Sequence, residues 1–526
     1  MASPPSSALA ALASSPASTS SASSSSSSSS SSLSSESDCP KGKLTRQSKP
    51  VALRTPKSEA PWQKMLDDNL RKLNSIDKEE TRDGMYFRRR FRIPFPLYTE
   101  LVTCMIDEGW FHGFGPQGQG QLDATKREEM RGASLWVKVL SVLRILGRGL
   151  VFDECFDGSG CSESMIGQFF HEFLGIFVSR LLHCVVCPPK TLQELNVHLR
   201  IYERLGMNGA FGSTDVTHIP LGKCPRSYAI MCTGKSGKPT LGYSMTCSHA
   251  RRIYHCSHGF AGSKNDKTIS KFEALLEAVS SEPLYTEATW TCFQADGQVL
   301  NRKGVYLICD GGYHKWYHMI CGLKNTASLA HTLWSCQMES VRKDVECLYG
   351  ILKMRFAILT RPLQYHSKTA PEYLRKMNNI VWSCCILHNL LLGYDRLDSL
   401  WTEHDVLSTW YADADAEFDS RFDLGAAAHQ AIIEKRTNSR QRLFRKSTLG
   451  KVRPRRNAIM VDARNFVHDE LVVLEGEPED ETQYHPSHTV RREELVESFH
   501  YAWNAGSVEW LSFPGTVHSS KLRNCN

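Results

Sequence analysis

The chain has 526 residues, of which 41% are hydrophobic and 23% are charged, and its formal net charge is +7. This is the composition of an ordinary soluble protein that can bury a core. No segment reaches the roughly 18 uninterrupted apolar residues of a membrane span, so we expect no contact with a membrane. The eighteen cysteines have no regular spacing and follow no secretory signal. They therefore indicate reduced thiols in the cytosol or nucleus and not a disulfide framework.

The first 61 residues are dominated by Ser, Ala and Pro, with an unbroken serine run from Ser23 to Ser32. A segment of this kind cannot bury enough apolar surface to offset its chain entropy, so we expect a disordered tail. The end of the tail is basic, with six Lys or Arg between Lys41 and Lys57 and no acid among them. This end is either a solvated linker or a nuclear import or phosphate-contacting arm.

Residues 62–204 have a helical pattern, with apolar residues at three and four spacing in 135–146 and in 165–182. Ser162 and Ser164 stand where an N-cap would precede the second of these helices. A short helix, a Gly-containing turn and another helix are compatible with a helix-turn-helix, and equally with an ordinary small helical bundle. We therefore predict an all-α, helix-turn-helix-like domain that binds DNA.

Four arginines are crowded between phenylalanines near the start of this domain, at Arg88, Arg89, Arg90 and Arg92. Arginines that alternate with aromatic residues can place guanidinium groups along a phosphate backbone. An amphipathic element with solvated arginines is an equally good interpretation. Both alternatives stay open at this point.

The pattern changes at about residue 205 to strands that alternate with helices, and this texture continues to about residue 395. Residues 208–221, 240–248 and 252–259 predict three successive strands separated by turns. A helical stretch at 267–280, a strand at 304–309 and long helices near 330–354 and 371–392 follow. Three adjoining strands followed by alternating helix and strand is the order of an RNase H-like α/β domain, which we predict for 205–395.

Residues 396–526 form a C-terminal extension that is harder to interpret. Its segment 435–456 holds ten Lys or Arg and no acid, including Arg442, Arg445 and Lys446. A bipartite nuclear signal or a DNA-binding tail is the preferred interpretation, and a plain solvated segment is the alternative.

Three acidic residues carry the candidate chemistry. Asp215 lies in the first predicted strand, Asp310 ends the strand 304–309, and Glu346 lies on an amphipathic helix, off its apolar stripe. Neighbouring strand ends in a parallel part of a sheet can bring the two aspartates together, and Glu346 is free to point at them. Taken singly, each acid is more often a turn, capping or solvated residue than a ligand.

Crowded carboxylates repel each other and raise each other's pKa unless a cation neutralises them. Hard oxygen ligands suit Mg²⁺ or Mn²⁺, and two such ions can promote attack on a phosphodiester and stabilise the leaving oxyanion. The trio therefore predicts a two-metal site that cleaves DNA.

Six stretches together resemble one known family: TDVTHIPLGKCPRSY, GKSGKPT, GFAGSKNDKTIS, YLICDGGYHKWYHMI, SVRKDVECLYGILKMRFAIL and CCILHNLL, spread over residues 205–395. In order and spacing they look like the DDE transposase domain of the PIF/Harbinger superfamily, in its plant-transposon-protein branch. The resemblance implies an RNase H-like core on which two aspartates and a glutamate hold the catalytic metals. It places these ligands at Asp215, Asp310 and Glu346.

The resemblance also marks residues around the ligands. His218, Asp266 and Lys353 are candidates to orient the acids or to contact the substrate, although Asn265 and Asp266 also make a good helix N-cap. The chain departs from the family's usual pattern at Cys347, where an arginine is usual, and at Tyr349, where a phenylalanine is usual. These departures remove no ligand.

The expected function is that of a Harbinger-like transposase or transposase-derived endonuclease that cuts DNA with two Mg²⁺ or Mn²⁺ ions and is able to join the freed ends to target DNA. The alternative is a nuclear DNA-binding or protein-interaction factor of transposon origin that does not cut. A hydrolase of small phosphoesters is disfavoured, because a small substrate needs no extended positive surface. The resemblance further implies a nuclear location and a Myb-like DNA-binding partner protein, and it leaves a homodimer open.

Overall fold

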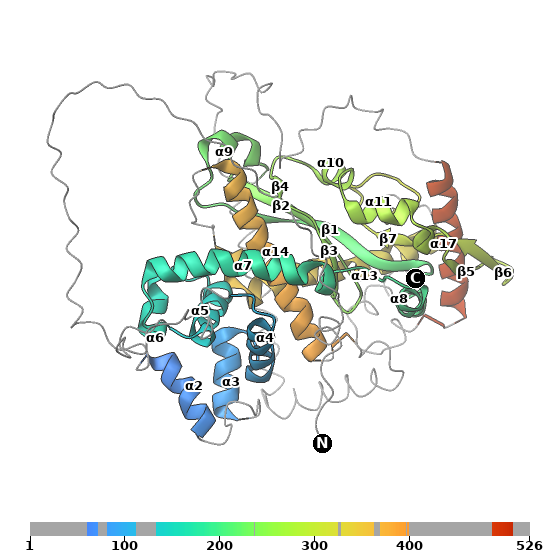
Figure 1. The fold of residues 1–526 in the computed structure, drawn as a ribbon. Coiled ribbons are helices and arrows are strands. Elements are labelled where there is room, and N and C mark those ends of the chain that lie inside the picture. Colours follow the sequence, from blue (N-terminus) through green and yellow to red (C-terminus); the bar gives the residue numbers. More distant parts are fainter. Residues whose placement is uncertain are drawn as a thin grey trace, which may run out of the picture. The chain divides into compact units, whose positions relative to one another are not determined.

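The computed structural model describes residues 60–71, 81–111, 133–235, 237–323, 328–361, 369–395, 397–398, 486–505 and 507–508. The predicted disordered tail before residue 60 and the basic segment 435–456 lie outside the described residues. The chain divides into two compact units, residues 1–395 with 485–526 and residues 396–484. Every helix and strand described below belongs to the first unit (Figure 1).

The amino-terminal part is helical, as predicted. Its helices are α2 (Pro61–Arg71), α3 (Arg82–Phe91), α4 (Phe95–Asp107), α5 (Leu135–Arg148), the 3-10 turn η5 (Asp153–Cys155), α6 (Phe156–Ser159), α7 (Glu163–Val185) and α8 (Leu192–Arg204). The two stretches with helical periodicity became α5 and α7. Ser162 caps α7, because its hydroxyl accepts the Met165 N–H at 3.4 Å. The helix-turn-helix assignment stays a prediction.

The second part is a mixed sheet with helices around it, so the prediction of an α/β fold is confirmed at this level. Its strands are β1 (Ala210–Pro220), β2 (Thr240–Cys247), β3 (Ile253–Cys256), β4 (Phe260–Ala261), β5 (Thr289–Phe293), β6 (Val299–Lys303), β7 (Tyr306–Ile308) and β8 (Met319–Ile320). The main sheet has the order β3-β2-β1-β7-β8, with β4 paired to β2. β1, β2 and β3 are antiparallel, whereas β7 and β8 run parallel to β1.

The remaining helices are α9 (Arg226–Cys232), α10 (Asp266–Ser270), α11 (Ala274–Ser281), α12 (Pro283–Thr286), α13 (Leu329–Arg355), the 3-10 turn η6 (Ala357–Leu359), α14 (Ala370–Tyr394) and α17 (Pro486–Asn504). The helical stretch predicted at 267–280 is two short helices, α10 and α11. None of the described helices is both long and apolar enough to cross a membrane. Each cysteine that the structure describes is a free thiol.

One core joins the sheet to the helices α8, α11 and α12. Leu195 and Leu199 of α8 pack there with Phe211 of β1, Tyr254 of β3 and Leu307 of β7, and all five are buried. α13 contacts β1 and β2, and α14 contacts β3 and lies along α7. The long helix α14 therefore connects the helical part to the sheet.

Two polar residues on the buried part of α14 make this connection specific. Asn389, 1% exposed, accepts the N–H of Ile253 at 2.9 Å and donates to the Ile253 carbonyl at 2.8 Å. It also donates to the carbonyl of Val185, at the end of α7, at 2.9 Å. The side chain thus extends the hydrogen bonding of β3 and satisfies a terminal carbonyl of α7.

Its neighbour His388 is held neutral between two partners. The guanidinium of Arg355 donates to His388 Nδ1 at 3.1 Å, and Nε2 donates to the carbonyl of Arg251 at 2.9 Å. Both ring nitrogens are therefore used by the Nε2-protonated tautomer. Burial, with the nearby positive charge of Arg355, lowers the pKa of His388 to about 3.

The carboxy-terminal helix α17 packs on α13 and β5, although a long stretch of sequence separates it from them. Arg491 of α17 is 2% exposed and donates to the carbonyls of Tyr317 and Gly304. Its guanidinium stands 4.0 Å from the centroid of the Tyr317 ring. The predicted C-terminal extension therefore contributes one helix to the same compact unit as the sheet.

We expect Asn389→Ala to lower the free energy of unfolding by about 3 kcal/mol, because three buried backbone groups lose their partner at once. Chemical denaturation measures this change. Asn301→Ala is the matched control, since Asn301 is exposed on β6, and it should change stability by less than about 0.5 kcal/mol. Equal effects of the two substitutions would show that the Asn389 contacts add nothing to stability.

His388 should make stability depend on pH. Between pH 6.5 and about 3 the unfolded chain binds a proton at this histidine that the folded protein does not, so the free energy of unfolding falls as pH decreases. The glutamine of His388→Gln can still donate and accept hydrogen bonds but does not titrate. Between pH 6.5 and 4.5 we expect its free energy of unfolding to fall by about 2 kcal/mol less than that of wild type. Denaturation at several pH values tests this, with exposed His183→Gln as the control. Parallel curves for wild type and His388→Gln would contradict the assignment.

Candidate functional site

Asp215 and Asp310 come together because β1 and β7 are parallel neighbours. Ser213 of β1 pairs with Ile308 of β7. Asp215 is two residues further along β1, and Asp310 is two residues beyond Ile308, just after the end of β7. The sequence predicted that both acids project from strand ends, but Asp215 lies in the middle of β1, because β1 continues to Pro220 in its pairing with β2.

A third acid, Asp266, lies beside them at the start of α10. A Cβ added to Gly312 would stand 2.9 Å from Asp310 Oδ1 and 3.5 Å from Asp266 Oδ2, so one point lies close to both carboxylates. The N–H of Gly312 donates to Asp310 Oδ1 at 2.6 Å, a close approach that a larger residue would obstruct. His314 Nε2 donates to the Lys267 carbonyl at 3.1 Å and ties this loop to α10.

Asn265 caps α10, since its Oδ1 accepts the N–H of Thr268 at 2.8 Å. Asp266 is therefore free of the capping function. Of the two alternatives that the sequence left, the N-cap is confirmed for Asn265, which begins the helix. The orienting role of Asp266 stays a prediction, and its carboxylate lies near Asp310.

The surroundings of the aspartates raise the pKa of Asp215 and of Asp266. The pKa of the Asp215 carboxyl is raised from 3.8 to about 7, chiefly by burial, and the charges of Asp310 and Asp266 act in the same direction. The N–H of Val216 and the guanidinium of Arg342 act against this increase. Burial and Asp310 also raise the pKa of Asp266. The site therefore favours positive charge or bound protons.

Glu346 is not joined to the aspartates directly. Its side chain is 48% exposed, and Arg342 Nη2 holds its carboxylate at 2.8 Å. Arg342 also pairs with Glu339 at 3.0 Å and lies 4.0 Å from Asp215 Oδ2. Among the residues that the structure describes, no three His, Cys, Asp or Glu side chains lie close enough together to hold a metal ion. Arg342 thus stands between Glu346 and the aspartates.

The face of α13 that carries Arg342 and Glu346 also contacts β1, through Tyr349 and Lys353. The hydroxyl of Tyr349 donates to the backbone carbonyl of Asp215 at 2.5 Å. Lys353 Nζ donates to Thr217 Oγ1 at 3.0 Å, and burial lowers the pKa of this lysine. Both contacts fix α13 beside the strand that carries Asp215.

His218 lies on β1 at the edge of the site. Its Nδ1 shares a hydrogen bond of 3.1 Å with Thr240 Oγ1. Burial lowers the pKa of the imidazole, and the charge of Asp266 acts in the opposite direction. His218 and Asp266 are therefore close enough to interact electrostatically.

Sequence reasoning missed a buried residue that anchors α13 two positions before Glu346. Asp344 is 4% exposed, and its carboxylate meets His249 Nδ1 at 2.5 Å and Arg251 at 3.3 Å. These contacts tie the helix to the turn between β2 and β3. Asp344 stands two residues before Glu346 in the sequence, but only its burial distinguishes it from the exposed charges around it.

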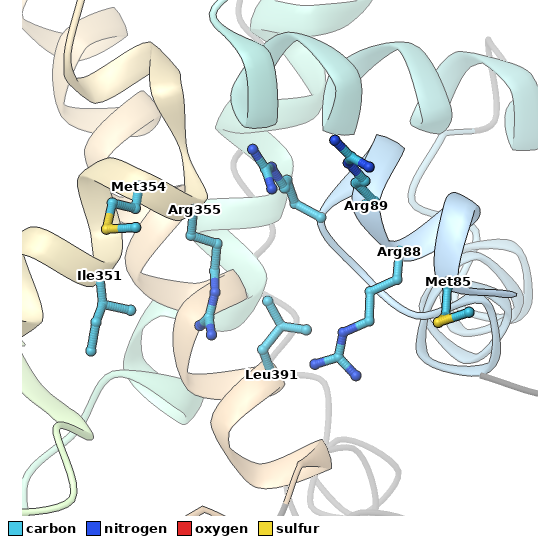
Figure 2. A pocket seen from close by; sticks show the side chains of 8 residues that line it. Met85, Arg88, Arg89, Ile351, Met354, Arg355 and Leu391 are labelled. Atoms are coloured by element: carbon cyan, nitrogen blue, oxygen red, sulfur yellow. The ribbon is translucent and has the colours of Figure 1, made fainter. Parts of the chain in front are cut away.

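Of the basic residues predicted to bind DNA, the structure describes those near α3 but not those of the segment 435–456. Arg88, Arg89 and Arg92 line an open cleft of about 530 Å³ between α3 and the ends of α13 and α14 (Figure 2). Arg90 is exposed at the end of α3, and its carbonyl accepts a hydrogen bond from Arg144 at 3.2 Å. Arg442, Arg445 and Lys446 lie outside the described residues.

Tyr349→Phe should lower the free energy of unfolding by about 1 kcal/mol, because the carbonyl of Asp215 loses its partner from α13. Thermal and chemical denaturation measure this loss. Tyr86→Phe is the control, since Tyr86 is 52% exposed. Unchanged stability of Tyr349→Phe would mean that this hydrogen bond contributes nothing.

Residues 187–398 match the family model described as plant transposon protein. No curated protein and no solved structure matches the chain. The matched region runs from just before α8 to just after α14, so it contains Asp215, Asp266, Asp310 and Glu346, and it leaves out the preceding helices and α17. The match supports a transposon-derived protein with a transposase-related function.

Proposed function

We propose that the protein is a DNA endonuclease of the PIF/Harbinger transposase type, with its active centre at Asp215 and Asp310. One observation carries the proposal. Within the region that matches the plant transposon protein family, Asp215 in the middle of β1 lies beside Asp310, which follows the end of the parallel neighbour β7. Asp310 therefore stands at the carboxyl end of a parallel strand, where open α/β sheets put their sites.

The order of the strands supports an RNase H-like core. Three antiparallel strands follow one another, and the later strands β7 and β8 pair in parallel on the other side of β1. This is the arrangement expected from the sequence for such a domain. The long helix α13 then contributes Glu346 from a separate layer.

Divalent metal ions fit the chemistry of these residues. Burial, with the charges of Asp310 and Asp266, raises the pKa of Asp215 to about 7 although Arg342 acts against this increase, so further positive charge would stabilise the ionised site. Carboxylate oxygens are the ligands that Mg²⁺ and Mn²⁺ prefer. Asp215 and Asp310 would hold such ions, with Asp266 or Glu346 as the further ligand. When bound, a pair of these ions supplies an activated water and charge stabilisation for phosphodiester cleavage.

Side chains of α13 position this helix and adjust the charge at the candidate site. Tyr349 and Lys353 hold α13 against β1 and so set the distance between Glu346 and Asp215. Arg342 offsets part of the negative charge and keeps Glu346 turned away from the aspartates. Glu346 can join the site as a ligand only if it leaves Arg342, whereas Asp266 already faces Asp310.

A second candidate function is a transposon-derived DNA-binding or interaction factor without nuclease activity. The pairing of Arg342 with Glu339, Glu346 and, more weakly, Asp215 favours it. An arginine that satisfies the acids within the protein reduces the need for a metal ion. The two functions make opposite predictions for cleavage.

The test is nicking of supercoiled plasmid by the purified full-length protein with Mn²⁺ or Mg²⁺. We expect Asp215→Asn and Asp310→Asn each to reduce the nicking rate about 100-fold or more, because ligands at the reacting centre are lost. Asp296→Asn is the matched control, since Asp296 is exposed in the turn between β5 and β6, and it should cut like wild type. Comparison of Asp266→Asn with Glu346→Gln identifies the third ligand.

Mn²⁺ binding provides a readout that does not depend on cleavage. Mn²⁺ should raise the melting temperature of wild type and of Asp296→Asn, and it should raise that of Asp215→Asn much less. Wild-type protein that neither cuts nor responds to Mn²⁺ would establish the second function instead. Nicking that persists at the wild-type rate in Asp310→Asn would refute the proposed active centre.

A further inference from the structure

The cleft beside α3 is lined by four guanidinium groups, those of Arg88, Arg89, Arg92 and Arg355. They come from two parts of the chain that are more than 250 residues apart, and Figure 2 shows Leu391 between Arg355 and Arg88. Sequence reasoning found the three arginines of α3 and its cap, but not Arg355. The fold therefore gathers more positive charge here than the sequence indicates.

The positive charge continues from the cleft over α5. A Cβ on Gly147 of α5 would stand 2.6 Å from Arg92 Cγ, which shows how closely α5 approaches this arginine. Arg144 of α5 donates to the carbonyl of Arg90 at 3.2 Å. Arg361 donates to the carbonyl of Gly149 at 3.2 Å, next to Arg148. We call the whole set the arginine band, which consists of Arg88, Arg89, Arg90, Arg92, Arg144, Arg148, Arg355 and Arg361.

The arginines of the band repel each other. Burial lowers the pKa of Arg92, and the charges of Arg148 and Arg89 lower it further. Burial likewise lowers the pKa of Arg144, with Arg90 and Arg148 acting in the same direction. A cleft lined by charge of one sign raises the local concentration of anions.

Structural partners offset only part of the charge in the cleft. Arg88 pairs with Asp395 at 2.6 Å, and the cleft adjoins the carboxy-terminal ends of α3, α13 and α14. Each helix end is equivalent to about half a negative charge, so among the described residues these ends and Asp395 balance roughly two to three of the four positive charges in the cleft. Capping of helix ends therefore does not account for all of the arginines.

We propose that the arginine band binds the sugar-phosphate backbone of DNA, at a site distinct from the acids of the sheet. A band of eight arginines over three helices and a 3-10 turn is larger than any single small anion requires, and an extended polyanion fits it. Met85, Ile351 and Met354 also line the cleft, and Figure 2 shows them outside the row of guanidinium groups. The choice of DNA as the polyanion rests on the proposed function.

The test measures binding of the full-length protein to a labelled 30-base-pair duplex over a series of NaCl concentrations, with EDTA present to prevent cleavage. Arg89→Gln/Arg90→Gln removes two exposed arginines whose side chains have no hydrogen bond or ion pair with another described residue. We expect the slope of log affinity against log salt to decrease in magnitude by about 2, with affinity about tenfold lower near 0.1 M salt. Arg180→Gln/Arg200→Gln, on exposed positions of α7 and α8, is the control with the same charge change and should keep the wild-type slope.

Two results would overturn the inference. One is an unchanged slope in Arg89→Gln/Arg90→Gln while wild type binds the duplex. The other is displacement of the duplex by poly-glutamate as effectively, per charge, as by unlabelled duplex, which would make the band a surface for an acidic protein segment. Neither depends on nicking, so loss of the proposed nuclease would leave the binding result standing, and the reverse is also true.

Discussion

The desolvation of half-buried carboxylates beside β1 and β7, with their mutual repulsion, is the constraint around which this structure is arranged. An increase in the pKa of Asp215 from 3.8 to about 7 corresponds to an electrostatic cost on the order of 4 kcal/mol for the ionised form. A fold that keeps Asp215, Asp266 and Asp310 together must offset this cost elsewhere. The extensive core beneath the sheet and the polar contacts of α14 supply that stability.

The helix α13 is held in place from several sides. Asp344 ties its middle to the turn after β2, Tyr349 and Lys353 attach its next turns to β1, and α17 packs against it. With the helix held by these contacts, the smallest change that would free Glu346 is an exchange of partners by Arg342. In the proposed nuclease, Arg342 would have to release Glu346 before this acid could act as a ligand.

Local patterns in the sequence predicted most of the elements near the site, because apolar periodicity and turn residues act over a few positions. They predicted β1, β2, β7, α13 and α14 closely and placed Asp310 at the end of β7, but they did not show that β1 continues past Asp215. The hairpin β5–β6 went unnoticed because β6 is largely exposed and polar. Asp344 and Arg355 acquire their surroundings from residues far away in the chain, so no local pattern distinguishes them, and Asp266 was singled out only through the family resemblance and the N-cap pattern. Tyr349 was noticed only as a departure from the usual phenylalanine, and its hydroxyl makes a contact that phenylalanine cannot make.

The acids and the arginine band share one helix, and this limits how one nucleic acid could reach both. Glu346 and Arg355 are nine residues apart on α13, which is about 14 Å along its axis and about half a turn around it. Their side chains therefore lie on opposite faces of the helix. A duplex held by the band cannot lie flat along α13 and meet the aspartates, so it must pass around the end of the helix near η6. Arg361 follows η6 and belongs to the band, which places positive charge on the path that such a duplex would have to take.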